Sequence, residues 1–186
     1  MGCDCGHITV KDESTETNNV GTKIKNKTLI LMKARTNVDD LEVDDFINQM
    51  LKLHNDERKK YKYDELTKNE DLNDLASEYA KELALRQGKI RYEDYIYEGL
   101  ILGENIIKSE TKEPKKIFDC WLKEGNDYNF NDKKFSHKTA HYTQIIWKDT
   151  KEVGIGIWHD NENKKYVTVV LYNPPGNTLG KFNENT

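Results

Sequence analysis

Apolar side chains recur at helical spacing in two long stretches of the chain, residues 43–54 and 72–84. Two aspartates follow Val43, and acidic side chains at this position interact favourably with the positive end of a helix dipole. The second stretch has a suitable N-cap in Asn69 and a suitable stop in Gly88. The pattern therefore predicts two amphipathic helices.

Two shorter helices are predicted further along the chain. The first covers residues 114–125, and it begins with a proline, which a first helical turn tolerates. Helical spacing places four of its side chains on one side: Ile117, Cys120, Trp121 and Glu124. We therefore expect Glu124 to be partly buried. The second short helix covers residues 139–146.

Two strands follow these helices. In residues 153–158, apolar positions alternate with glycines and a tryptophan, and residues 166–172 are rich in β-forming side chains. The polar residues 160–164 between them are a natural hairpin turn, and residues 89–103 are predicted to be a loop or a short strand. Helices that precede and flank locally paired strands indicate a layered α+β domain.

The domain is predicted to span residues 43–183. Residues 1–42 have a polar composition with no sustained apolar period, which is typical of a flexible N-terminal tail. Residues 184–186 are assigned to a short C-terminal tail. No apolar run approaches the ~20 residues that a membrane-spanning helix needs.

The net charge bears on the kind of partner that the protein binds, and the number of cysteines bears on its cellular location. A formal net charge of −4 disfavours nucleic acid as a partner, because nucleic-acid-binding proteins present a net basic face. Of three cysteines, only Cys120 lies in the predicted domain, whereas secreted domains often contain several disulfides. The N-terminus also lacks the apolar segment of a secretion signal. An intracellular, reducing location is therefore favoured.

Four motifs together resemble the CAP superfamily, which includes antigen 5 and the plant pathogenesis-related proteins. The likeness is nearest to the Golgi-associated type. The motifs are Gly103-Glu104-Asn105, Trp121-Leu-Lys-Glu124, His141 to Gly156 and Leu171 to Asn177. The resemblance covers nearly the whole predicted domain. It implies the three-layer α-β-α sandwich of the CAP fold.

The resemblance also implies a polar cleft. In CAP proteins two glutamates and two histidines line it, and Glu104, Glu124 and His141 match three of the four. Tyr92 or one of its neighbours stands where the second histidine is expected. Two carboxylates and one imidazole are able to bind zinc or to transfer protons. Because the set is incomplete, we favour a buried Glu–His network that holds loops together, with no cofactor required.

His54 and Cys120 are predicted to have packing roles rather than chemical ones. His54 lies in a stretch that resembles the family's first helix, outside the cleft, and is predicted to be a core or capping histidine. Cys120, on a helix, is expected to be a packed side chain rather than a nucleophile. No hydrolase or phosphate-binding motif is present in the sequence.

Three aromatic residues lie in a polar loop just before the His141 motif: Tyr128, Phe130 and Phe135. One interpretation is that they anchor the loop to the core. The other is that they form an apolar surface for a sterol, an acyl chain or a protein. Their spacing matches the caveolin-binding motif that CAP proteins carry at this place, and in some relatives this loop is implicated in sterol binding.

The first residues resemble an acylation signal. Gly2 is suited to myristoylation and Cys3 and Cys5 to palmitoylation, although Gly6 stands where serine or threonine is usual. Two attachments are needed, because one myristoyl chain gives a membrane affinity of only ~10⁴ M⁻¹. Lysines between residues 23 and 35 would assist on an anionic membrane surface. The Golgi-associated relatives are likewise myristoylated and not secreted.

These observations favour a non-enzymatic protein on the cytoplasmic face of Golgi or plasma membranes. Its expected partners are membrane lipids or a sterol, with a protein partner or a homodimer as further options. A metal-dependent hydrolase that uses Glu104, Glu124 and His141 is the alternative enzymatic hypothesis. A secreted CAP effector is the third hypothesis.

Overall fold

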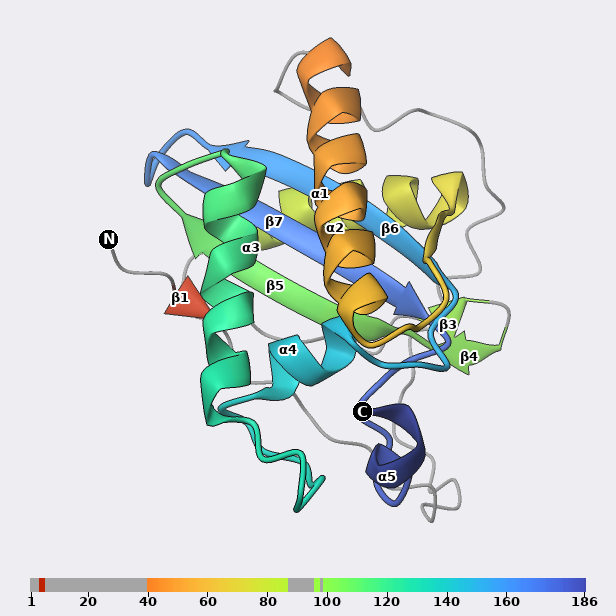
Figure 1. The fold of residues 1–186 in the computed structure, drawn as a ribbon. Helices are drawn as coiled ribbons and strands as arrows, with labels where there is room; N and C mark the ends of the chain where they lie inside the picture. Colours follow the sequence, from red (N-terminus) through yellow and green to blue (C-terminus); the bar gives the residue numbers. More distant parts are fainter. Residues whose placement is uncertain (1–3, 6–39, 87–95, 98) are drawn as a thin grey trace, which may run out of the picture.

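A five-stranded sheet lies between helices on both of its faces (Figure 1). The computed structural model describes residues 4–5, 40–86, 96–97 and 99–186. The helices are α1 (Asp40–Lys60), α2 (Glu70–Leu85), α3 (Pro114–Leu122), the 3-10 helix η1 (Lys123–Asp127), α4 (Ala140–Ile145) and α5 (Phe182–Asn185). The strands are β1 (Asp4–Cys5), β2 (Thr67–Lys68), β3 (Ile96–Tyr97), β4 (Leu100–Ile101), β5 (Gly103–Ser109), β6 (Glu152–Asp160) and β7 (Lys165–Asn173).

The order of the strands in the main sheet is β1-β5-β7-β6-β2. The three long strands β5, β7 and β6 are antiparallel to one another. Strand β1 pairs with the outer edge of β5, and this pair is also antiparallel. Strand β2 pairs parallel with β6 at the opposite edge. Strands β3 and β4 form a separate antiparallel pair.

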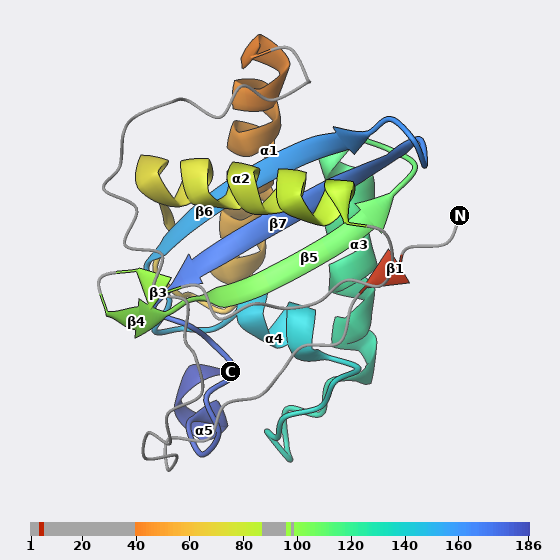
Figure 2. The same ribbon diagram turned by 180° about the vertical axis from the view of Figure 1, so that it is seen from behind.

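Each face of the sheet has its own core. Helices α1, α3 and α4 cover one face, and α2 covers the other, as the two opposite views show (Figures 1 and 2). The glycines of β6 allow α2 to approach closely. A Cβ atom on Gly154 would lie 2.1 Å from the backbone of Leu72, and one on Gly156 would lie 2.3 Å from the backbone of Ala76. The alternating glycines therefore have a packing role on the α2 face.

Most predicted elements are present in the structure, with shifted boundaries. The side chain of Asn69 accepts a hydrogen bond from the backbone N–H of Leu72, so the predicted N-cap of α2 is confirmed. The predicted helix over residues 114–125 ends at Leu122, and the chain continues as η1 through Asp127. Gly88 lies outside the described residues.

The chain ends differ from the predicted domain limits. Helix α1 begins at Asp40, and β1 places residues 4–5 of the expected tail in the main sheet. Asn185 and Thr186 are both buried, so these two residues pack against the domain instead of forming a tail. Within the described ranges, no helix combines the length and the apolar character needed to cross a membrane.

Candidate functional site

The carboxylate of Glu124 holds the start of α4. One oxygen, Oε2, accepts the backbone N–H groups of His141 and Tyr142 at 3.0 and 3.2 Å. These two groups belong to the first turn of the helix, where no intrahelical partner exists. The other oxygen, Oε1, lies 2.7 Å from Nδ1 of His141. An ionised carboxylate only accepts hydrogen bonds, so we assign the ring proton to Nδ1.

Both members of this pair are shielded from solvent. The His141 side chain is 3% exposed and that of Glu124 is 16% exposed. The ring of Trp121 stacks on the imidazole, with the two centroids 6.1 Å apart and the planes at 14°. The predicted burial of Glu124 beside His141 is therefore present, and one carboxylate serves both as a helix cap and as a ring partner.

Arg58 binds the other end of α4 and the segment that follows it. Its side chain is fully buried. Each of the five N–H groups of its guanidinium donates a hydrogen bond to a backbone carbonyl. The acceptors and distances are Asp64 at 2.8 Å, Ile145 at 3.2 Å, Trp147 at 2.6 Å, Lys148 at 3.3 Å and Thr150 at 3.2 Å. Burial lowers the pKa of Arg58 to about 10, so the side chain keeps its charge at neutral pH.

A chain of buried hydrogen bonds connects α1 to α4. Nδ1 of His54 lies 2.8 Å from the Met50 carbonyl and therefore carries the proton, which leaves Nε2 to accept from the Tyr172 hydroxyl at 2.8 Å. The side-chain amide of Asn105 donates to the Tyr172 oxygen and to the His141 carbonyl. The prediction of a core role for His54 is confirmed.

Glu104 lies on the opposite face of the sheet from Glu124 and His141. It pairs with Leu171 across β5 and β7, and residues directly opposite each other in an antiparallel pair share a face. Leu171 belongs to the core under α2, and the hydroxyl of Tyr79 in α2 donates to Glu104 at 3.4 Å. The sheet therefore separates Glu104 from the other two predicted cleft residues.

Glu104, Glu124 and His141 do not come together as one set of metal ligands in the structure. Zinc sites commonly use three or four protein ligands. In the part of the chain that the structure describes, no group of three or more histidine, cysteine, aspartate or glutamate side chains is arranged to hold a metal. The Nδ1 atom of His141 is already bonded to Glu124. Tyr92, the predicted substitute for the missing histidine, lies outside the described residues.

The aromatic loop has two buried anchors and one exposed ring. Tyr128 is 8% exposed, and its hydroxyl lies 2.6 Å from that of Thr186. Phe135 is partly buried against the core and packs on Phe182. Phe130 is 38% exposed. Of the three aromatic residues predicted to contact lipid, two therefore hold the loop in place.

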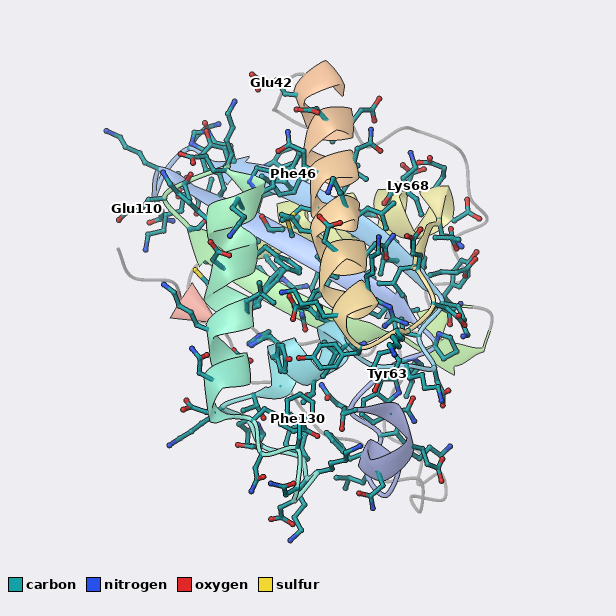
Figure 3. All side chains as sticks on the ribbon, viewed as in Figure 1. Glu42, Phe46, Tyr63, Lys68, Glu110 and Phe130 are labelled. Carbon is teal, nitrogen blue, oxygen red and sulfur yellow. The ribbon has the colours of Figure 1, made fainter. Side chains whose placement is uncertain are left out.

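Phe130 continues a row of stacked rings from the end of α1. Its ring lies 5.7 Å from that of Tyr61, and Tyr61 lies 5.9 Å from Tyr63, with the planes of both pairs within 25°. Figure 3 shows Phe130 and Tyr63 at the same end of the molecule, near the last turn of α1. Tyr61 and Tyr63 were not among the predicted site residues.

The residues expected to carry acyl groups lie at the N-terminus. Gly2 and Cys3 are outside the described residues, and Cys5 forms part of β1. Cys120 is disulfide-bonded.

Arg58 was missed by sequence reasoning, although a signal for it exists. Phe46, Met50, His54 and Arg58 recur every four residues, so Arg58 continues the buried stripe of α1. A charged residue on such a stripe indicates a buried charge that needs partners. The sequence predicts Tyr172 to be in a strand but gives no signal for its buried hydroxyl contacts, because the partners of that hydroxyl come from distant segments.

Known proteins resemble this chain in sequence and in fold. The model of the cysteine-rich secretory protein family, CAP, matches residues 51–172. The Golgi-associated plant pathogenesis-related protein 1 of Homo sapiens is 33% identical over 143 residues, which cover 75% of this chain and 91% of that protein. Protein PRY2 of Saccharomyces cerevisiae is 28% identical over 142 residues, which cover 76% of this chain and 41% of PRY2.

The fold comparison agrees with the sequence comparison. The structure of venom allergen-like protein 4 of Schistosoma mansoni matches with a TM-score of 0.59 and 22% identity, over 76% of this chain and 95% of that one. The predicted three-layer α-β-α sandwich of the CAP type is therefore confirmed.

Replacing Glu124 tests its role as a cap. We expect Glu124→Ala to lower the free energy of unfolding by about 2–4 kcal/mol, because it leaves two helix N–H groups and the His141 ring without their acceptor. Glu124→Gln keeps one acceptor oxygen and should lose about half as much. Urea denaturation measures both values, and an unchanged stability of Glu124→Ala would contradict this role.

The titration of His54 predicts a pH dependence of stability. Burial, the largest cause, lowers the pKa of His54 from 6.5 to about 4. Above pH 6.5 the ring is neutral in both the folded and the unfolded chain, and the full stability is present. Between pH 6.5 and pH 4 the His54 ring binds a proton in the unfolded chain but stays neutral in the folded chain. The free energy of unfolding therefore falls by about 3 kcal/mol as the pH falls through this range.

The non-titrating variant His54→Gln provides the control for this pH effect. Carboxylates titrate in the variant and in the parent chain alike, so the difference between their stability–pH curves isolates His54. Urea midpoints at half-unit pH steps give both curves. Parallel curves between pH 4 and pH 6.5 would contradict the lowered pKa.

Proposed function

Because the chain belongs to the cysteine-rich secretory protein family, we propose that it is a non-enzymatic, membrane-associated binding protein. Its ligand is a membrane lipid, either a sterol or an acyl chain, and a protein partner or a second copy of the chain is the alternative occupant. The ligand contacts the loop of residues 128–135, and the protein requires no cofactor. Nucleic acid is not a partner.

The exposed ring of Phe130 carries this proposal. Tyr128 and Phe135 already anchor the loop, so the fold does not require a third aromatic side chain there. The Phe130 ring nevertheless remains exposed and stacks on Tyr61. Stacked, partly exposed rings offer a flat apolar surface, which suits a rigid apolar ligand better than a water-filled polar cleft does.

The polar residues support a binding function over a catalytic one. A general base needs access to a substrate proton. The Nδ1 atom of His141 is committed to Glu124, Trp121 covers a face of the ring, and the side chain is almost fully buried. Glu124 is committed to the first turn of α4. These contacts give both residues a structural role.

The N-terminal sequence supports a membrane location. Gly2 as a myristoylation site, with Cys3 or Cys5 as a palmitoylation site, would supply the two attachments that stable anchoring needs. A relative that covers most of this chain carries "Golgi-associated" in its name. We therefore propose the cytoplasmic face of Golgi or plasma membranes as the location, with secretion as the alternative.

Phe130→Ala tests the lipid surface. We expect about tenfold weaker binding to sterol-containing liposomes, because the variant removes most of an apolar ring that the lipid would cover, and tenfold corresponds to about 1.4 kcal/mol. Flotation with liposomes of phosphatidylcholine, with and without cholesterol, measures the effect. The thermal stability should change little, since the ring is 38% exposed in the folded state.

Leu85→Ala is the matched control for Phe130→Ala. Leu85 is 70% exposed at the end of α2, on the other face of the sheet, and its replacement should leave liposome binding unchanged. Equal binding by the parent chain and by Phe130→Ala would overturn the proposed lipid surface.

Gly2→Ala tests the anchor in cells. The alanine blocks myristoylation, so we expect most of the full chain to move from the membrane fraction to the soluble fraction. Gly21→Ala, which lies outside the acylation signal, is the control and should stay with the membranes. An unchanged membrane fraction for Gly2→Ala would exclude anchoring through residue 2.

A further inference from the structure

A small hollow lies where the end of α2 meets the turn between β6 and β7. Its volume is about 330 Å³, and it is lined by Ala84, Leu85 and residues 158–162. Both ribbon views place this turn and the loop of residues 128–135 at opposite ends of the molecule (Figures 1 and 2). The hollow is therefore separate from the proposed lipid surface, and its ligand does not depend on that proposal.

One wall of the hollow is apolar. Leu85 is 70% exposed in the last turn of α2, and Trp158 of β6 is partly buried against the core under α2. The ammonium of Lys81 lies over the Trp158 ring, 5.1 Å from its centroid. Lys81, Ala84 and Leu85 are three or four residues apart in sequence, so they share one side of α2. The indole ring beside the hollow therefore already holds one ammonium group.

The opposite wall carries negative charge. The carboxylate of Asp160 accepts hydrogen bonds from the backbone N–H groups of Glu162 and Asn163 and from the Asn163 side chain, and it thereby holds the turn. The Glu162 side chain is exposed, and no ion pair in the described part of the chain involves its carboxylate. This carboxylate is therefore available to a ligand at the rim of the hollow.

The end of α2 adds to this negative charge. The last carbonyls of a helix carry a partial negative charge, and the last turn of α2 contains no basic residue. The ammonium of Lys108, from β5, donates to the Leu83 carbonyl at 3.3 Å. Two ammonium groups of the protein thus lie against elements that form the hollow, one on the indole ring and one at the end of the helix. The lining therefore favours a cation with an apolar stem.

We propose that the hollow is a docking site for a lysine side chain of a partner protein. The aliphatic stem of that lysine lies on Leu85 and against the Trp158 ring, and its ammonium reaches Glu162. Lysine fits better than arginine, because arginine gains most from a carboxylate that is free for two parallel hydrogen bonds. The carboxylate of Asp160 is already used in the turn.

A side chain of a protein also fits better than a free amine. The exposed side chains of Leu85 and Glu162 leave the hollow open to solvent on one side. A site for a free small ligand buries most of the surface of that ligand. A lysine needs to bury only its stem, because its backbone stays outside with the partner.

Binding is measured on the full chain with the peptide acetyl-Gly-Lys-Gly-amide. Two of the three tryptophans, Trp121 and Trp147, are fully buried, so a shift of the Trp158 indole N–H signal in NMR spectra reports on the hollow. A matched peptide with norleucine in place of lysine keeps the stem and removes the charge. We expect the lysine peptide to bind about fivefold more tightly. Equal binding of the two peptides, or no shift with the lysine peptide, overturns the proposal.

Two surface variants separate the roles of the walls. Glu162→Gln should weaken binding of the lysine peptide about fivefold and leave the norleucine peptide unaffected, because it removes the charge that recognises the ammonium. Lys81→Met should strengthen binding of the lysine peptide about threefold, because it removes a competing cation from the indole ring. Glu65→Gln, at an exposed carboxylate outside the hollow, is the control and should change neither peptide.

Each of these variants is able to contradict the proposal. Unchanged binding to Glu162→Gln, or weaker binding to Lys81→Met, overturns it. Both side chains are exposed, so the variants should keep the fold, and thermal denaturation checks this. The free amine n-butylammonium is the last comparison. Binding of this amine without binding of the lysine peptide overturns the assignment to a partner protein.

Discussion

The buried charge of Arg58 is the constraint on which the site depends. A guanidinium taken out of water must find partners for all five of its N–H groups, and here it finds them in carbonyls of two separate segments. One acceptor, Asp64, follows α1, and the other four lie at the end of α4 and just beyond it. Because these carbonyls must converge on one planar group, Arg58 sets both the path of the chain after α4 and the distance between α4 and α1. A lysine at this position has three donors on one atom and cannot reach the same five acceptors.

Helix α4 is short enough that its two ends decide its position. A six-residue helix has few internal hydrogen bonds, and in isolation it would not persist. An anionic side chain, Glu124, binds its first turn and a cationic one, Arg58, binds its last carbonyl, that of Ile145, which is the arrangement that the helix dipole favours. The His54–Tyr172–Asn105 chain then fixes the helix against the sheet. His141 lies at the centre of these contacts, so its burial follows from the way that the fold is assembled.

Features that depend on neighbouring residues could be predicted from the sequence. Contacts between distant segments of the site could be predicted less well. The Asn69 cap, the glycine-bearing strand and the burial of Glu124 follow from spacing within one segment, and the place of Glu124 beside His141 follows from the family resemblance. The side of the sheet on which Glu104 lies depends on the register of β5 against β7, and a shift of one residue would reverse it. Arg58 continues a visible apolar stripe, yet its five acceptors come from two other segments and are backbone atoms, which carry no residue-type signal. The stacking of Tyr61 on Phe130 likewise joins segments almost seventy residues apart.

The contacts of α4 give the buried polar residues a structural role and leave the aromatic residues available for a ligand. Every hydrogen bond described for Glu124 goes to α4, so a ligand that used its carboxylate would compete with the helix that carries His141. Such a ligand would have to replace three hydrogen bonds at once, two of them to backbone groups that have no other partner in the helix. An apolar ligand on Phe130 and Tyr61 replaces only water, and it leaves the buried polar network intact. Binding at the aromatic surface is therefore compatible with the folded state, whereas chemistry at the polar pair would require part of the fold to open.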